Sequence, residues 1–321
     1  MSRHKVKAKY TQILGLERLA AAYVHQANPY GVKPHGANAC CAAQSSLLSQ
    51  SDRSNHRRWH RSLLTLIFSW LCGFALTSEG ADPEVPDALL GLAPSLSGQS
   101  LRYFEGHDDT QGYLSLPQGE IKGGVILIHE WNGLSQRIRE TADAFAAEGY
   151  AALAADLYKG RTGSHREENM QLVRETQANP ELIIENLNAA VQALKQQSGV
   201  TRVATIGWCF GGGIALSYAL GGETHEGTAI FYGRLVTDPE QLRAIDHEIY
   251  GTFAGLDRGP SVDQVNAFVS AMRTAGIKND VHIYDDVNHG FWLHADQDLD
   301  VRLAPAADAW RRLKAYLGRV L

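Results

Sequence analysis

The sequence predicts an α/β fold in which helices cover both faces of a central, mostly parallel β-sheet. Strand-length apolar runs alternate along the chain with helix-length amphipathic stretches, as they do in successive βαβ units. The runs are almost continuously apolar, which is expected of strands that are covered on both faces. Glycines also stand where three of the predicted helices should end, at Gly149, Gly199 and Gly276.

All of the predicted strands and helices lie after residue 100. The apolar runs that we expect to form strands are residues 124–129, 151–156, 203–207, 228–232, 249–254 and 281–284. The stretches with helical spacing of apolar residues are residues 139–148, 183–196, 213–220, 262–275 and 305–317. Only about 15 residues separate the strand that ends at Tyr232 from the next strand. This short connection predicts that the fold has no large lid.

The chain before this domain has three parts. Residues 1–56 are polar and irregular, and we expect them to be disordered or not part of the native chain. Residues 57–81 combine a basic patch, an uncharged apolar run over 63–76 and a tail of small residues, which is typical of a secretory signal peptide. Proline and glycine in residues 82–100 predict a linker, and residues 101–321 are expected to form the single α/β domain.

The apolar run 63–76 is shorter than the roughly 20 residues that a membrane-spanning helix needs. We therefore expect an exported protein, periplasmic or secreted, with no stable membrane insertion once the signal is cleaved. Because the signal begins more than fifty residues into the chain, we interpret the printed sequence as starting upstream of the native start. The alternatives are an uncleaved anchor formed by 63–76 and a buried helix of a domain that includes the N-terminal segment.

Composition excludes some classes of partner. The chain has 30 Lys and Arg against 35 Asp and Glu, a net charge of -5, and no basic stripe that would bind a phosphate backbone. A small molecule is therefore the expected partner, and nucleic acid is not. Of the four cysteines, only Cys209 would remain after cleavage near Ala81, so the mature domain has no disulfide framework.

The stretch Gly207-Trp208-Cys209-Phe210-Gly211 has the G-x-S-x-G pattern of a nucleophile elbow, with cysteine in place of serine. It lies between a predicted strand and a predicted helix, as that motif requires. The tight turn needs small residues where the backbone closely approaches its neighbours. The N-terminus of the following helix favours a thiolate. We interpret Cys209 as a nucleophile; the alternative is a small buried hydrophobic residue.

A nucleophile of this kind needs a base and an acid that orients the base, in the chain order nucleophile, acid, base on an α/β-hydrolase scaffold. Asp257 and His289 follow two successive predicted strands, at the edge of the sheet where sites form in open α/β folds. Asp285 and Asp286 are rival acids, but they lie in the loop of the base itself. Four other histidines are disfavoured as the base, because they lie within a strand, in polar surroundings or before the nucleophile: His129, His247, His282 and His294.

In this order and context Cys209, Asp257 and His289 resemble the Cys-Asp-His triad of the dienelactone hydrolase family, which has the α/β-hydrolase fold. The resemblance extends over the chain from about residue 101 and includes the H-E-W-N-G stretch at 129–133. It implies that Glu130 contacts the resting thiol and helps to form the thiolate when substrate arrives. It also implies that the backbone N–H groups of Trp131 and Phe210 form the oxyanion hole.

The residues themselves give Glu130 weaker, independent support. A carboxylate at the carboxyl end of a strand, beside an aromatic residue, lies where burial raises its pKa towards that of a usable base. The alternative is an exposed acid in a loop.

One departure from the family concerns the substrate carboxylate. The dienelactone-specific members hold this group with arginines, one of them four residues after the catalytic histidine, and that place is Leu293 here. Arg166 and Arg174 are candidates for the other arginine and hence for substrate binding, but neither aligns securely. The sequence therefore predicts a hydrolase without predicting that its substrate is a dienelactone.

The predicted function is hydrolysis of a small carboxylic ester or lactone by thiolate attack, through a thioester acyl-enzyme and an oxyanion hole. The resemblance places this activity in the carboxymethylenebutenolidase class of carboxylic-ester hydrolases. No cofactor or metal is expected, because the 13 histidines show no paired spacing with acids or cysteines. The alternative is a non-catalytic ligand-binding member of the same fold. A redox role for Cys209 is disfavoured, since no resolving cysteine is available.

Overall fold

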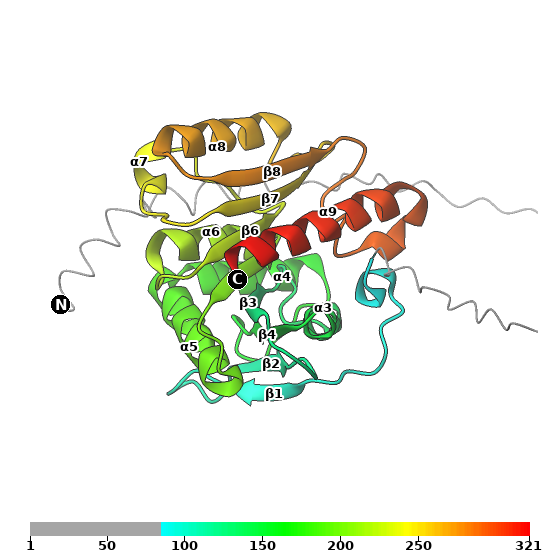
Figure 1. Cartoon of the computed structure of the whole chain (residues 1–321), viewed down its shortest axis with the longest axis vertical. Helices are drawn as coiled ribbons and strands as arrows, with labels where there is room; N and C mark the ends of the chain where they lie inside the picture. Colours follow the sequence, from blue (N-terminus) through cyan, green and yellow to red (C-terminus); the bar gives the residue numbers. More distant parts are fainter. Residues whose placement is uncertain (1–84) are drawn as a thin grey trace, which may run out of the picture. The chain divides into compact units, whose positions relative to one another are not determined.

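The structure is a computed structural model, and it describes residues 85–321. The predictions made for residues 1–56 and 57–81 lie outside the described residues. Within residues 85–321 the chain forms an eight-stranded, mostly parallel sheet in the order β1-β2-β4-β3-β5-β6-β7-β8 (Figure 1). The predicted α/β fold with an open parallel sheet is confirmed.

The six predicted strands form the parallel part of this sheet, and each lies within two residues of its predicted position. They are β3 Gly123–Ile128, β4 Tyr150–Ala155, β5 Val203–Trp208, β6 Gly227–Phe231, β7 Ile249–Ala254 and β8 Asn279–Tyr284. In the parallel register Ile128 of β3 is the partner of Gly207 of β5, and Trp208 is the partner of Phe231 of β6. The residues that follow β3, β5 and β6 therefore emerge together at the carboxyl edge of the sheet.

Helices cover both faces of the sheet. The helices are η2 Asp87–Leu90, α3 Gln136–Ala147, α4 Arg166–Gln177, α5 Pro180–Ser198, α6 Phe210–Gly221, α7 Pro239–Leu242, α8 Val262–Ala275, η3 Ala295–Gln297 and α9 Leu299–Val320. Helices α3 and α9 pack on one face, and α5, α6 and α8 pack on the other. Gly199 and Gly276 end α5 and α8 in the left-handed conformation, with φ of 75° and 80°, as the sequence predicts.

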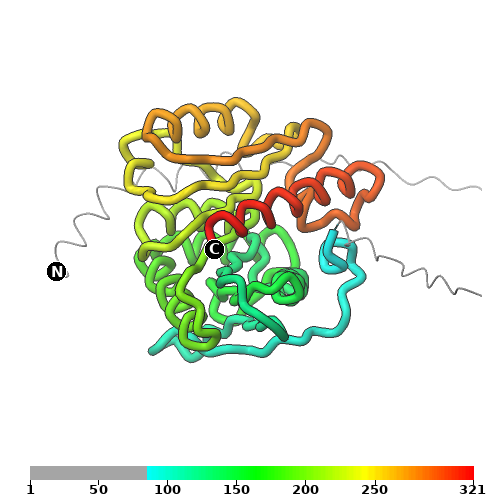
Figure 2. The backbone as a smooth tube through the Cα atoms, in the orientation of Figure 1, coloured from blue at the N-terminus to red at the C-terminus, as the bar shows by residue number. Residues whose placement is uncertain are grey.

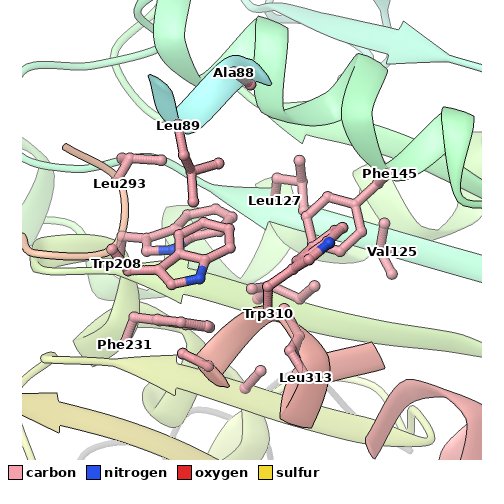
Figure 3. Close-up of a cluster of buried hydrophobic side chains, with 14 of the residues drawn as sticks. Ala88, Leu89, Val125, Leu127, Phe145, Trp208, Phe231, Leu293, Trp310 and Leu313 are labelled. Carbon is pink, nitrogen blue, oxygen red and sulfur yellow. The ribbon is translucent and has the colours of Figure 1, made fainter. Parts of the chain in front are cut away.

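The core on the α3 and α9 face is rich in aromatic side chains (Figure 3). Trp208 at the end of β5 stacks on Trp292, with ring centroids 5.5 Å apart, and Trp310 of α9 packs edge-on against Phe145 of α3. Burial of such large apolar surfaces is the main stabilising contribution to the fold. Because Trp208 directly precedes Cys209, packing of this core also fixes the backbone on which Cys209 lies.

The N-terminal part of the described chain differs from the prediction of a linker over 82–100. Val85, Ala88 and Leu89 are buried in the same core cluster, and η2 lies beside η3 (Figure 2). The prediction also missed two short strands, β1 Gln99–Arg102 and β2 Gln111–Ser115, which extend the sheet in antiparallel fashion. The physical reason is that too few apolar residues are present here to form a periodic pattern, so long-range packing decides the structure.

The connection between β6 and β7 spans residues 232–248 and contains one short helix, α7. It is too short to fold into a separate cap over the carboxyl edge, in agreement with the predicted absence of a large lid. In the part of the chain that the structure describes, no helix is long and apolar enough to cross a bilayer.

Candidate active site

Cys209 lies in the sharp turn between β5 and α6. Its backbone has φ 55° and ψ -116°, a conformation that side-chain-bearing residues rarely adopt. The amide of Cys209 donates to the carbonyl of Phe231, and its own carbonyl accepts from Gly212 and Gly213. These bonds hold the strained turn, so that the thiol is presented at the carboxyl edge of the sheet.

The glycines of the motif are required by close packing of the backbone. A Cβ atom added to Gly207 would lie 2.1 Å from the carbonyl oxygen of Gly211, and one added to Gly211 would lie 2.1 Å from that of Ile128. No side chain fits at either position without moving the backbone. The same contacts press the start of α6 against the end of β3. The elbow and the residues after β3 therefore lie together.

His289 and Asp257 meet at the same edge, on the loops after β8 and β7. Nδ1 of His289 lies 2.6 Å from Oδ2 of Asp257, whose side chain is only 6% exposed. Gly259 donates to the other carboxylate oxygen. Since the carboxylate can only accept, Nδ1 of the imidazole carries the proton, which leaves Nε2 as the nitrogen that can act on the neighbouring Cys209 thiol.

The charges around His289 suit a base that becomes protonated. Burial alone would lower the pKa of His289, but the neighbouring Cys209 sulfur and the Asp257 carboxylate more than offset it, and the pKa is raised well above its usual value. The ring of Tyr232 packs 4.9 Å from the imidazole and limits its movement. The three groups can therefore form a thiolate–imidazolium pair that is oriented by a carboxylate.

The rival candidates lie elsewhere. Asp285 and Asp286 are exposed and make no hydrogen bond to His289. His282 lies on β8 and packs against Tyr284, while His247 lies at the opposite edge of the sheet. The structure thus brings together the three residues that the sequence singled out, and their catalytic roles stay a prediction.

The two backbone amides expected to form an oxyanion hole are available. Phe210 is the first residue of α6, and Trp131 lies in the turn after β3. Within residues 85–321 neither amide donates a hydrogen bond to another protein group. Because Gly211 packs directly on Ile128 and His129, the start of α6, which carries Phe210, lies close to the turn after β3, which carries Trp131. Such a pair of donors can bind an oxygen that gains negative charge.

His129 gives the turn after β3 its fixed shape. Its ring is fully buried, and burial lowers its pKa. Nδ1 donates to the carbonyl of Glu130 at 2.7 Å, and Nε2 accepts from the amide of Leu157 at 3.2 Å. The neutral ring thereby ties the Glu130–Trp131 turn to the loop after β4. The sequence placed His129 among the rejected bases, and its role here is structural.

Glu130 is buried and paired, which excludes the alternative of an exposed loop acid. Its Oε2 atom lies 2.8 Å from Nε2 of His294 on the loop after β8. The side chain of Glu130 is 8% exposed and that of His294 is 30% exposed. The contact between Glu130 and Cys209 that the family resemblance implies is not among the hydrogen bonds of the described residues. The sequence did not predict that His294 is the partner of Glu130, because the two residues lie 164 positions apart and no local pattern links them.

Leu293 is completely buried, in the same cluster as Leu89 and Trp208 (Figure 3). The position that carries an arginine in the dienelactone-specific members thus faces the core here. Arg166 is the first residue of α4, and Arg174 is an exposed residue of its last turn. The loop before α4 approaches the site, since Gly163 donates to the carbonyl of Asn132. Among residues 85–321, no hydrogen bond or ion pair fixes Arg166, so its assignment to substrate binding stays a prediction.

A cavity of about 200 Å³ is lined by residues of the loop after β4 and of α4 and α5, including Tyr158, Arg161 and Asn186. Tyr158 separates it from the elbow, since its ring packs on His129 and Phe210. Among the described residues, no group of three or more His, Cys, Asp or Glu side chains is arranged to hold a metal ion.

The chain is similar to proteins of one family along most of its length. A model of the dienelactone hydrolase family matches residues 110–321. A Methylorubrum extorquens protein that is provisionally named a carboxymethylenebutenolidase is 29% identical over 206 residues, which cover 60% of this chain and 70% of that protein. A Saccharolobus solfataricus protein with the same provisional name is 28% identical over 248 residues, covering 65% of this chain and 94% of its own.

Solved structures agree with the fold. A structure named m3DLH aligns with a TM-score of 0.62 at 26% sequence identity, and the alignment covers 70% of this chain and 98% of that one. The residues that the family model matches, 110–321, include Cys209, Asp257 and His289.

Proposed function

Because the chain belongs to the dienelactone hydrolase family, we propose that it hydrolyses small carboxylic esters or lactones with Cys209 as the nucleophile. The family match supports a hydrolase. The observation that supports this mechanism is the linked series of contacts from Asp257 through His289 to Cys209 on a strained elbow. Membership of the dienelactone hydrolase family and the arrangement of these three residues thus favour the same class of reaction, hydrolysis through a covalent intermediate on a nucleophile.

In the first half of the proposed reaction, the Cys209 thiolate attacks the carbonyl carbon of the ester. A C–S bond forms, and the electron pair of the C=O double bond moves to oxygen, where the amides of Trp131 and Phe210 stabilise the charge. The carbonyl re-forms as the C–O bond to the alcohol breaks. Protonated His289 gives its proton to the departing alkoxide, which leaves a thioester and a neutral imidazole.

In the second half, neutral His289 removes a proton from water as the water oxygen attacks the thioester carbon. The C–S bond breaks, the carboxylic acid product leaves, and the thiolate returns beside the imidazolium. Asp257 holds the ring with Nδ1 protonated through both halves, so that Nε2 always faces the reacting groups. Because His289 begins and ends each cycle protonated, the reaction needs no further acid or base.

The size of the substrate follows from the surroundings of the elbow. Only the short helix α7 interrupts the connection between β6 and β7, so little of the chain covers the carboxyl edge. We expect small, accessible esters or lactones to fit best.

Turnover of p-nitrophenyl acetate by the full-length protein tests this proposal. Wild type is expected to hydrolyse the ester, and Cys209→Ala is expected to lose that activity while keeping its fold. Iodoacetamide should inactivate the wild type, and ester substrate should protect it. For this labelling, Cys40, Cys41 and Cys72 are changed to serine so that Cys209 is the one thiol. Full activity after complete alkylation of Cys209 would contradict the proposed nucleophile.

We also propose that the protein is exported, because residues 57–81 have the pattern of a cleaved signal. The mature chain should begin near residues 78–82. Intact-mass measurement of the protein recovered from its native compartment checks this. A native N-terminus upstream of Arg57 would show that the segment is not a cleaved signal.

A further inference from the structure

The loop after β4 forms one wall of a cavity that the proposed reaction does not use. This cavity of about 200 Å³ lies between that loop, the turn before β2 and helices α4 and α5. At the packing density of protein interiors, about 0.75, such a volume holds about ten non-hydrogen atoms. Tyr158 lines the cavity and also packs its ring on Phe210 of the elbow. The cavity is therefore separate from the position of Cys209.

Hydrogen bonds fix the walls of the cavity. Oδ2 of Asp156, the buried residue that follows β4, accepts from the amide of Gln111 at 3.1 Å and from that of Gly160 at 2.6 Å. The turn before β2 and the loop after β4 therefore meet at one carboxylate oxygen. On α5, Asn186 accepts from the hydroxyl of Tyr103 and donates to the carbonyl of Asp156. A cavity with walls held in this way binds a ligand without first having to order them.

Two of the polar side chains that line the cavity are donors without a protein partner. Thr110 is 1% exposed, and within residues 85–321 its hydroxyl makes no hydrogen bond to another protein group. Lys159 is exposed and makes no ion pair with any described residue. Thr110 precedes Gln111 and Lys159 precedes Gly160, so the two donors come from segments that meet at the same carboxylate. A buried hydroxyl without a partner costs free energy that a bound acceptor removes.

The rest of the lining indicates what kind of molecule fits. Arg161 also lines the cavity, but Glu175 pairs with it at 2.7 Å, which leaves Lys159 as the uncompensated charge of the lining. The acids of the turn before β2, Asp108 and Asp109, are exposed and do not line the cavity, so solvent screens their charges. Apolar surface is supplied by Phe104, Leu157, Leu182 and Ile183. An anion with one charge on an apolar body matches these surroundings.

We propose that this cavity is a second binding site, which takes a small carboxylate with an apolar body, such as an aromatic acid. The carboxylate accepts from the hydroxyl of Thr110 and lies beside the ammonium of Lys159, and the apolar body packs on the apolar part of the wall. The inference goes beyond the proposed function, because binding requires neither Cys209 nor turnover. The acids that the proposed hydrolysis releases belong to the same chemical class, and that link alone rests on the proposed function.

A fluorine NMR titration of the full-length protein with 4-fluorobenzoate tests the site. We expect a dissociation constant of about 1 mM, since the probe is small and only two polar groups hold it. 4-Fluorobenzamide has the same size without the charge, and trifluoroacetate has the charge without the apolar body. Each should bind at least about fivefold more weakly than 4-fluorobenzoate.

Substitutions in the lining assign the binding to this cavity. Lys159→Gln should weaken the binding of 4-fluorobenzoate by about fivefold and leave that of 4-fluorobenzamide unchanged. Lys195→Gln, in the last turn of α5 and outside the cavity, removes the same charge and is the matched control. Leu182→Trp should fill the space and abolish the binding of both molecules.

Thr110→Val tests the buried donor, because it removes the hydroxyl and keeps the shape of the side chain. It should weaken the binding of 4-fluorobenzoate by about tenfold. It should not destabilise the fold, since the hydroxyl has no protein partner to lose. Circular dichroism and urea unfolding check that each variant is folded.

Three results would overturn the proposed site. These are the absence of detectable binding to the wild type, an equal affinity for the acid and the amide, and an affinity for the acid that neither Lys159→Gln nor Thr110→Val changes. The last result would place the probe elsewhere on the protein. None of these measurements involves hydrolysis, so the loss of ester turnover in Cys209→Ala stays a separate test of the proposed function.

Discussion

The two edges of the parallel sheet use histidine in opposite ways. At the carboxyl edge His289 and His294 each face a buried carboxylate, and the pKa of each is raised despite burial. At the amino edge His225 and His247 face each other, with ring centroids 4.5 Å apart, and both bind the hydroxyl of Thr228 at 2.9 Å. Burial lowers the pKa of both of these, and that of His225 falls to about 4, lowered further by the charge of His247.

The comparison shows that the partner, and not burial, decides whether a histidine becomes charged. Burial acts in the same direction at both edges, because it always disfavours the imidazolium. Buried carboxylates and a thiol reverse that effect at the carboxyl edge. At the amino edge the exposed Asp246 carboxylate, 3.3 Å from Nδ1 of His247, raises the pKa of that histidine but does not overcome burial. The carboxyl edge can therefore hold and release protons during a reaction, and the amino edge is a neutral hydrogen-bonded part of the core.

The largest expected effect is that of removing the nucleophile. Cys209→Ala should lower kcat/KM for p-nitrophenyl acetate by at least about 10³, and His289→Ala should cost a similar factor. Residues that act as a unit are not additive, so the double variant should be little worse than either single one. His225→Gln, at the amino edge, is the control and should keep its activity at neutral pH. If the losses caused by Cys209→Ala and His289→Ala multiply in the double variant, the two residues do not act together.

Asp257→Asn is expected to have the next largest effect. An asparagine amide can donate to Nδ1, which favours the imidazole form with its proton on Nε2, the wrong nitrogen for a base. Activity should fall by roughly 10³ to 10⁴ if the precedent of the serine enzymes applies. Circular dichroism should show an unchanged fold, since the amide preserves the shape of the side chain. A variant with more than a tenth of wild-type activity would remove Asp257 from the triad.

Changes to the histidines of the amino edge should alter the free energy of unfolding and leave the hydrolytic activity unchanged. The pKa of His225 is lowered from 6.5 to about 4 in the folded state, so the folded protein binds fewer protons than the unfolded chain between these values. The stability that neutral His225 contributes is complete above pH 6.5 and is lost as the pH falls towards 4, by roughly 3 kcal/mol in total. The raised pKa of His289 has the opposite sign, since its contribution is complete below pH 6.5 and is lost as the pH rises through the raised value.

Urea unfolding at pH 7.5 and pH 4.5 measures the contribution of neutral His225 to the free energy of unfolding. The gap in unfolding free energy between pH 7.5 and pH 4.5 should be smaller in His225→Gln than in the wild type. His282→Gln, which changes a half-buried histidine of β8, should leave the gap unchanged. An identical pH dependence in His225→Gln and the wild type would show that His225 is not held neutral by the fold.

Much of the carboxyl edge follows from local sequence, and the rest depends on distant contacts. The elbow around Cys209 is a five-residue pattern between a strand and a helix, and Asp257 and His289 each follow a recognisable strand. The pairing of Glu130 with His294 has no such pattern, because both lie in loops and only the strand order brings them together. The strands β1 and β2 and the buried residues before them were missed for a similar reason, since their packing depends on the completed sheet.

The amino edge was not predicted at all, and its residues show why. His225 and His247 each stand in a short polar loop before a strand, where a solvated side chain is the simplest expectation. Their burial depends on Thr205 and Thr228, which come from neighbouring strands and close the hydrogen-bonded cluster. A histidine's surroundings in three dimensions therefore decide its role at both edges.

The smallest effect expected concerns substrate charge at the carboxyl edge. Leu293 is completely buried in the core, so the loop after β8 presents no arginine to a substrate carboxylate at that position. The nearby cations Arg137 and His294 are already paired with Asp296 and Glu130. A carboxylated ester would have to displace one of these partners, whereas a neutral ester of the same size would not.

We therefore expect kcat/KM for a neutral short ester to equal that of its carboxylated analogue or to exceed it by up to about tenfold, roughly the value of one unpaired surface charge. Arg166→Ala and Arg174→Ala should leave this ratio unchanged. A strong preference for the acidic ester that is abolished by either substitution would show that α4 supplies a carboxylate-binding arginine, and that the two edges differ in substrate recognition as well as in the charge of their histidines.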